Sequence, residues 1–170
     1  MSKPMYLPKG WRAGPDKLGR KFVHDEVSGL YVQVPRGSVL GPQLLANGDF
    51  AGGATGWAVT GADGTHITTF SAGTLRYQSD TLSPQLNVTQ AGVLILNRVY
   101  EVTVVTSAWT SGSLKTDSLT AINGGTTVFS AAAGTVTFRG IAASTDFAIT
   151  RNTTNVDATI DSISIREVRA

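Results

Sequence analysis

From Leu44 onward, apolar and polar residues mostly alternate, and turn residues interrupt this alternation about every eight to twelve residues. Alternation with a period of two is the pattern of a strand that buries one face. His66–Phe70 and Leu75–Ser79 alternate on either side of Ser71–Gly73, and they therefore predict a β-hairpin.

The longest predicted strand is Arg98–Trp109, in which Tyr100, Val102 and Val104 share one face. Further strands are predicted at residues 84–90, 146–152 and 157–168, and residues 126–131 and 135–142 predict a second hairpin across Ala133-Gly134. No amphipathic stretch keeps a helical spacing beyond about two turns. About eight short strands with turns rich in glycine and asparagine predict an all-β fold, a jelly-roll β-sandwich.

The first 43 residues differ in composition from the predicted sandwich at 44–170. They hold five of the six prolines, which disfavours a long helix or continuous strands, although residues 21–34 predict a small hairpin. This segment also contains Tyr6, Trp11 and Phe22, and aromatic residues are uncommon in a tail that contacts only water. We therefore expect an extended arm that becomes ordered on a partner, the alternative being a flexible tail. The expected contact residues of the arm are Tyr6, Leu7, Trp11, Arg12, Lys17, Arg20, Lys21 and Phe22.

The charge is divided unevenly along the chain. Residues 1–43 carry seven Lys/Arg and three Asp/Glu, a net +4, whereas the remaining residues carry seven and nine, a net −2. A basic arm favours docking on an acidic surface. The basic residues are scattered among prolines and glycines without a dense run, which disfavours nucleic acid as the partner.

Composition and motifs give little support for catalysis. The chain has no cysteine, which excludes disulfides and Cys-based zinc sites. His24 and His66 lie in unrelated contexts, and no nucleophile elbow, P-loop or dinucleotide fingerprint is present. Glu101 and Glu167 are the only glutamates of the predicted sandwich and show no pairing in sequence. The expectation is a protein that is not an enzyme and holds no cofactor.

The segment Asn47-Gly48-Asp49 allows two interpretations. Asn47, Asp49 and Asp161 carry the oxygen ligands that calcium prefers, but the loops lack the dense acidic spacing of a dedicated calcium loop. The favoured interpretation is a turn that the Asn47 and Asp49 side chains cap through their own backbone. No metal is therefore expected, with those three residues as the minority alternative.

Two tryptophans of the predicted sandwich are candidates for contact with a sugar, because an aromatic face packs against the apolar face of a pyranose. Trp57 begins an alternating run and is expected in the core. Trp109 ends a strand beside a Thr-Ser-Gly turn, which makes it the candidate glycan contact at a rim.

The segments LLANGDFAGGATGW at the start of the sandwich and IDSISIREV at its end resemble, together, the carbohydrate-binding type of jelly-roll module that recurs in bacteriophage virion proteins. The matching residues are Asn47, Gly48, Asp49, Phe50, Gly56 and Trp57, then Ile160, Asp161, Ser164, Arg166 and Glu167. The resemblance covers Leu44 to about Val168. Asn97 stands where the family often has a glycine before Tyr100, and asparagine tolerates the same left-handed turn.

The resemblance implies a structural protein of the virion, made in the host cytoplasm and, with no signal peptide expected at its N-terminus, not placed in a membrane. The first hypothesis is a capsid decoration (cement) protein whose arm binds other virion proteins, either the major capsid protein or subunits of the tail or neck. Low charge and many small residues favour a homo-oligomer, by preference a trimer. The alternative hypothesis is a glycan-binding module in a tail or fibre component that contacts the host surface.

Overall fold

The structure is a computed structural model that describes residues 38–81, 83–122, 127–129 and 132–169, together with the backbone of two short strands. These are β1 (Val23–His24) and β2 (Tyr31–Val32), which pair antiparallel. Both strands lie within residues 21–34, for which the sequence predicts a small hairpin. Apart from these two strands, residues 1–37 lie outside the described part, including every expected contact residue of the arm named above.

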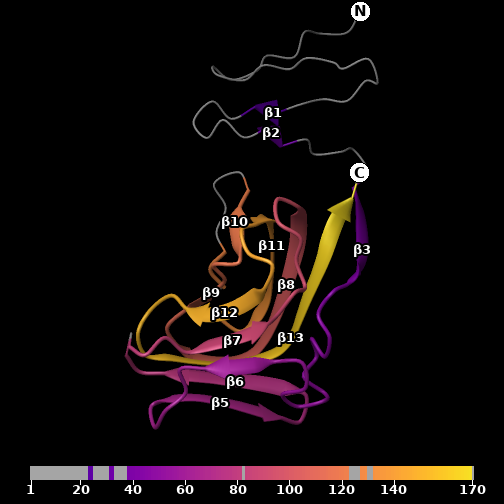
Figure 1. The fold of residues 1–170 in the computed structure, drawn as a ribbon. Helices are drawn as coiled ribbons and strands as arrows, with labels where there is room; N and C mark the ends of the chain where they lie inside the picture. The colour runs from indigo at the N-terminus through magenta and orange to yellow at the C-terminus, as the bar shows by residue number, and fades with distance from the viewer. Residues whose placement is uncertain are drawn as a thin grey trace, which may run out of the picture. The chain divides into compact units, whose positions relative to one another are not determined.

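The larger of the two sheets of the sandwich has seven strands. Six of them follow one another in a main path, and β3 (Val39–Gln43) pairs with β13 (Val156–Arg169) outside that path. The strand pairs along its main path are all antiparallel (Figure 1). The main path runs in the order β10 (Leu119–Ala121), β11 (Gly134–Ala142), β8 (Val99–Ser111), β13 (Val156–Arg169), β6 (Thr74–Ser79) and β5 (His66–Ser71).

The smaller sheet packs across the larger one. Its order is β4 (Ala58–Thr60), β7 (Asn87–Gln90), β12 (Phe147–Arg151) and β9 (Leu114–Lys115). Lys115 also forms an isolated antiparallel bridge with Val128 beyond β9. No helix is present among the described residues, so none there is long and apolar enough to cross a membrane. The prediction of an all-β sandwich of the jelly-roll type is confirmed.

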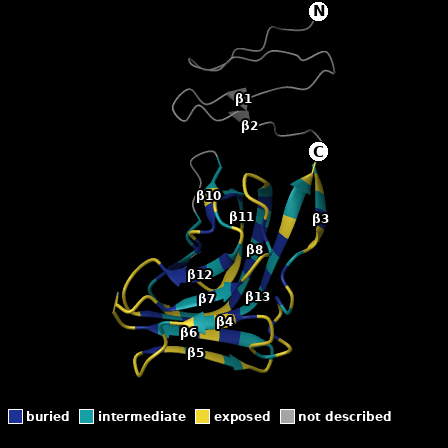
Figure 2. Ribbon diagram, in the orientation of Figure 1, coloured by how far each residue is buried: buried dark blue, intermediate teal, exposed yellow. Residues whose placement is uncertain are grey.

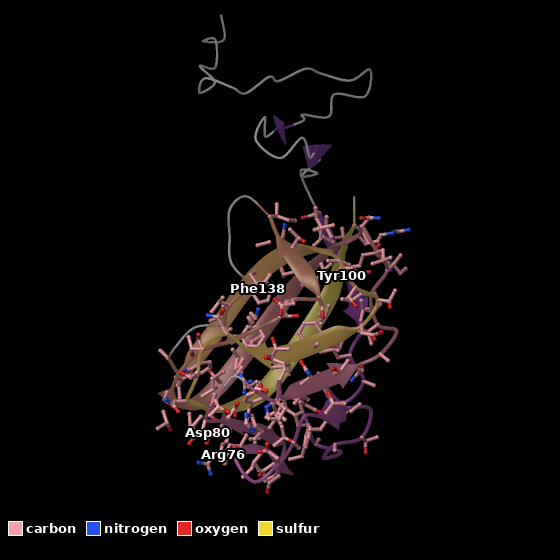
Figure 3. All side chains as sticks on the ribbon, turned by 60° about the vertical axis from the view of Figure 1, so that its left-hand side comes forward. Arg76, Asp80, Tyr100 and Phe138 are labelled. Atoms are coloured by element: carbon pink, nitrogen blue, oxygen red, sulfur yellow. The ribbon has the colours of Figure 1, made fainter. Side chains whose placement is uncertain are left out.

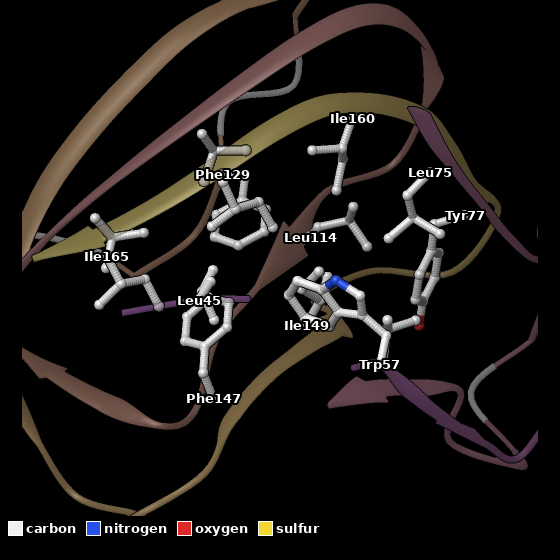
Figure 4. Close-up of a cluster of buried hydrophobic side chains, with 14 of the residues drawn as sticks. Leu45, Trp57, Leu75, Tyr77, Leu114, Phe129, Phe147, Ile149, Ile160 and Ile165 are labelled. Atoms are coloured by element: carbon white, nitrogen blue, oxygen red, sulfur yellow. The ribbon is translucent and has the colours of Figure 1, made fainter. Parts of the chain in front are cut away.

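The core lies between the two sheets, where alternate residues of each strand face inward. Tyr100, Val102 and Val104 of β8 are buried, as their spacing predicted. Val88 of β7 and Ile149 of β12 belong to the same core cluster from the smaller sheet. Figure 4 shows Ile149 among the buried side chains of this cluster. Because these inner positions are close-packed, the outward positions of each sheet are held in a fixed array.

Of the two hairpins predicted within the sandwich, one forms and the other does not. Residues 66–70 and 75–79 do form the β5–β6 hairpin, with Ala72 and Gly73 at its turn in the left-handed region. The predicted hairpin of 126–131 with 135–142 is wrong. Thr127–Phe129 instead hydrogen-bonds with Leu114–Thr116, and β11 pairs with β8 and β10. Phe129 is buried there, and its ring centroid lies 6.1 Å from that of Phe138 on β11.

The folded sandwich begins before Leu44, where the sequence placed the boundary of the arm. Its compact unit runs from Leu40 to Val168, and β3 is already part of the larger sheet. The Gln43 side chain fixes this strand: its Nε2 donates to the Ile163 carbonyl at 2.9 Å, and its Oε1 accepts from the Ile165 N–H at 2.7 Å. A glutamine side chain that takes the place of backbone hydrogen-bond partners leaves no alternating strand pattern in the sequence.

Candidate functional site

The outward side of the smaller sheet presents two parallel rows of side chains that cross its strands. Since residues opposite each other in antiparallel strands point to the same side, the register Thr60↔Asn87↔Thr150↔Lys115 aligns four polar side chains. We call this set the polar row. The register Ala58↔Thr89↔Ala148 aligns three small side chains next to it, which we call the small row.

The polar row holds hydrogen-bonding capacity that the protein does not use. Thr150 Oγ1 is buried and has no hydrogen-bond partner, and only 5% of the Thr150 residue is exposed. Thr60 is exposed, while Asn87 and Lys115 are half-buried, so access increases toward both ends of the row (Figure 2). A hydroxyl that is withdrawn from water and left without a partner is costly. Because Thr150 Oγ1 is buried, a ligand on this sheet meets the groups of Thr60, Asn87 and Lys115 instead.

Several polar groups on the outward side of the larger sheet are paired with one another. Arg76 pairs with Asp157 at 2.9 Å, and Arg139 pairs with Glu101 at 2.8 Å. Figure 3 shows Arg76 and Asp80 toward one end of the sandwich and Tyr100 toward the other. Thr103 and Thr137 also share a hydrogen bond of 3.0 Å.

The opening corner of the sandwich uses Asn47 and Asp49 in its own loop. The Asn47 Oδ1 accepts from the Gly52 N–H, and its Nδ2 donates to the carbonyls of Gly53 and Thr55 at 2.8 and 3.0 Å. Asp49 Oδ1 accepts from the Ala51 N–H. These bonds are the side-chain caps that the favoured interpretation of the segment predicted.

The third residue of the calcium alternative, Asp161, lies on β13, where its carboxylate accepts a hydrogen bond from the Ser107 hydroxyl. Asn47 and Asp161 therefore each bond to different partners within the protein. No group of three or more His, Asp or Glu side chains suited to a metal occurs among the described residues.

Trp57 and Trp109 both have their indole N–H groups bonded to the backbone. Trp57 is buried beside Phe50, and its Nε1 donates to the Asn47 carbonyl at 3.1 Å. The core position predicted for Trp57 is thus confirmed. Trp109 is half-buried against the core, and its Nε1 donates to the Gly112 carbonyl at 2.8 Å. Part of its ring remains accessible at the end of β8.

His66 and Glu101, the residues considered for hydrolysis, lie in separate settings. His66 is buried, with Nδ1 2.8 Å from Asp63 Oδ1 and Nε2 3.3 Å from Thr81 Oγ1. The Thr65 N–H and the His66 side chain together lower the pKa of the Asp63 carboxyl to about 2. Glu101 lies on the outward side of the larger sheet in its pair with Arg139. The geometry does not assemble them into one site.

The sandwich buries an arginine that was not predicted from the sequence. Arg151 is only 2% exposed, and its guanidinium donates to Ser79 Oγ of the other sheet and to the Pro84 carbonyl at 2.7 Å, while Nε has no partner. Beside it, burial raises the pKa of Tyr77 to about 12. The signal was present in the sequence, because Arg151 follows Phe147 and Ile149 at the spacing of the inward positions.

No protein-family model matches the chain, and no curated protein sequence matches it. Among solved structures, the chain is similar to the CBM22-1 xylan-binding domain from Paenibacillus barcinonensis Xyn10C, with a TM-score of 0.46 and 20% identity, over 76% of this chain and 97% of that one. It is also similar to a CBM4 structure, with a TM-score of 0.41 and 20% identity over 70% and 96% of the two chains. The N-terminal cellulose-binding domain from Cellulomonas fimi β-1,4-glucanase C gives a TM-score of 0.42 and 18% identity over 75% and 95%.

Proposed function

We propose that the sandwich is a non-catalytic module that binds an uncharged polysaccharide across the outward side of its smaller sheet. The observation that carries the proposal is the polar row, in which the exposed Thr60 and the half-buried Asn87 and Lys115 present polar groups on one side of the sheet. Sugars offer many hydroxyl groups that both donate and accept, and they suit a surface of hydroxyl and amide groups.

The two rows lie side by side across the strands, which favours a ligand that runs across the strands in the same direction. Alanine and threonine side chains in the small row are short, so a chain lying on them can bring its hydroxyls beside the polar row. Neighbouring strands are about 4.8 Å apart, so the polar row extends about 14 Å over its four strands. This length suits an extended oligosaccharide better than a single sugar.

The charges along this surface favour an uncharged ligand over an acidic one. Lys115, the one cationic residue of the polar row, pairs with Asp117 at 2.9 Å between Nζ and Oδ1. Its positive charge is therefore already neutralised, in contrast to the unpaired Lys/Arg groups that bind phosphate or sulfate. The remaining members of both rows are uncharged.

The double variant Thr60→Val/Asn87→Ala is expected to weaken polysaccharide binding at least about tenfold, because the hydrogen bonds of two accessible side chains, worth about 1 kcal/mol each, are lost. Valine keeps the shape of threonine, so the fold of β4 is unchanged. The measurement is a glycan array followed by calorimetry on the polysaccharide that binds.

Thr135→Val, an exposed position of β11 on the other sheet, is the matched control and should bind as the unmodified chain does. Absence of binding to every uncharged polysaccharide would contradict the proposal. Full binding by the double variant together with loss of binding on Trp109→Ala would move the ligand from the smaller sheet to the rim at Trp109.

A second candidate function, that of a virion structural protein, is favoured by the division of charge along the sequence. Residues 1–43 carry a net +4 and the rest a net −2, which suits an arm that attaches the protein to an acidic surface of other virion proteins. In that setting the sandwich projects from the particle. The number of copies per particle distinguishes a capsid decoration protein from a component of the tail or fibre.

Deleting residues 1–37 is expected to leave a folded sandwich that no longer co-sediments with virions lacking this protein. The deletion stops at residue 37 because β3, which follows, pairs with β13. The control is the full chain, and circular dichroism checks the fold of the truncated one. Attachment of the truncated chain at full occupancy would contradict this second candidate.

A further inference from the structure

Strand β5 ends the larger sheet with a free edge, and the structure gives this edge unusual properties. It is the last strand of the path β10-β11-β8-β13-β6-β5, and Figure 1 shows it as the outermost strand on that side. We propose that two copies of this chain associate by pairing their β5 strands antiparallel, so that the larger sheets of both copies become continuous.

The backbone groups that are free for such pairing can be identified from the register of the hairpin. Ser71 and Thr74 flank the two-residue turn, so Ser71, Thr69 and Ile67 direct their N–H and C=O groups toward β6. The same groups of His66, Thr68 and Phe70 point to the free edge. The bonds of His66 agree with this alternation.

At His66, the N–H donates to Asp63 Oδ1 at 2.8 Å and the C=O accepts from the Asp63 N–H at 3.0 Å. The edge groups of His66 are thus already satisfied within the chain. The groups that remain for a partner strand are the N–H and C=O of Thr68 and Phe70.

These two residues select one register for a symmetric pair. With a two-fold axis at Thr69, Thr68 of each copy lies opposite Phe70 of the other, and each such pair exchanges two N–H···O bonds. Every free edge group of Thr68 and Phe70 is then used. A register shifted by two residues would place Phe70 opposite His66, whose edge groups are taken by Asp63.

The other edge strands of the described part are protected against pairing, whereas β5 is not. Natural sheets protect their edges with short strands, proline, charge or bulges. Strands β4, β9 and β10 have three, two and three residues, and β3 contains Pro42. Strand β5 has six residues, HITTFS, without proline, lysine, arginine or an acid.

A second copy of the chain is the occupant that fits this edge. Ile67 is 41% exposed on the outward side, and the selected register places it opposite Ser71 of the other copy and diagonal to its Thr69, which covers part of its side chain. No Lys, Arg, Asp or Glu of β5 opposes its own copy across the axis. On the neighbouring β6, Arg76 is held by Asp157, which limits repulsion between the two copies.

The test uses the absence of cysteine from the chain. In the proposed register, Thr69 lies opposite Thr69 of the other copy as a non-hydrogen-bonded pair, with Cα atoms about 4.5 Å apart, which lies within the range of a disulfide. The variant Thr69→Cys is therefore expected to form a disulfide-linked dimer with oxidised glutathione. Thr135→Cys, exposed on β11, is the control and should remain uncrosslinked.

Sedimentation velocity of the unmodified full chain over a wide range of concentration should show a reversible dimer. Thr69→Lys places two like charges on the axis and should raise the dimer dissociation constant at least about tenfold, since opposed like charges destabilise a strand pair. Thr135→Lys should leave this constant unchanged. A chain that stays monomeric, a trimer, or equal crosslinking of Thr69→Cys and Thr135→Cys would each overturn the proposal.

Discussion

Replacing Phe50 with alanine is expected to lower the free energy of unfolding by about 3–5 kcal/mol, the range for loss of a fully buried aromatic ring. Phe50 has no exposed surface, and its ring centroid lies 5.5 Å from that of Trp57 and 6.0 Å from that of Phe70. Alanine keeps the Cβ atom, so the strain of the positive φ of 56° is the same in both proteins. The loss therefore reports on the ring.

Urea unfolding followed by tryptophan fluorescence measures this change. Phe70→Ala serves as the comparison, because Phe70 is half-buried at the same contact and should cost clearly less. A loss below about 1 kcal/mol for Phe50→Ala would mean that the opening corner does not anchor the sandwich.

Replacing Arg151 with alanine is expected to cost about 3–5 kcal/mol, because it leaves a cavity and removes the donors of Ser79 Oγ and the Pro84 carbonyl. Arg151→Met is expected to cost less. The methionine fills most of the space of the arginine stem and no longer requires a charge to be buried. The contrast between the two variants separates the contribution of volume from that of charge.

Urea unfolding of the two variants gives the free energies to compare. A methionine variant as unstable as the alanine variant would show that the hydrogen bonds of the guanidinium, and not its volume, hold the two sheets together at this end. Neither substitution reaches the polar row, because Arg151 points inward on β12 and Thr150 points outward. Ligand binding measured in parallel should remain unchanged.

Strand positions were the part of the fold that could be predicted best. The spacing of Tyr100, Val102 and Val104 predicted the buried face of β8, and Ser71–Gly73 predicted the β5–β6 turn. Local turn chemistry was also predictable: Asn47 and Asn97 have φ values of 53° and 63°, in the left-handed region that asparagine tolerates. These features depend on neighbours in sequence, so the sequence carries their signal.

The candidate site could not be predicted in the same way. The polar row joins Thr60, Asn87, Lys115 and Thr150, each of which stands on a different strand. Threonine in a strand is ordinary, and nothing around Thr150 in the sequence indicates that its hydroxyl lacks a partner. Trp109 is a candidate that the sequence alone indicates, because aromatic residues are conspicuous. The polar row consists of common residues whose alignment depends on the register of the strands.

The sequence by itself determined the fold class, the strand spacing, the turn residues and the division of charge between arm and sandwich, because alternation, turn chemistry and charge are local properties of the chain. Only the tertiary structure decided which strands pair. The strand pairing in turn decided the polar row, the bonds of Gln43 and Arg151, and the free edge of β5. Strand pairing is a contact between distant segments whose edges are chemically alike. Burial of side chains selects among the available partners, and this selection is made only when the whole core packs.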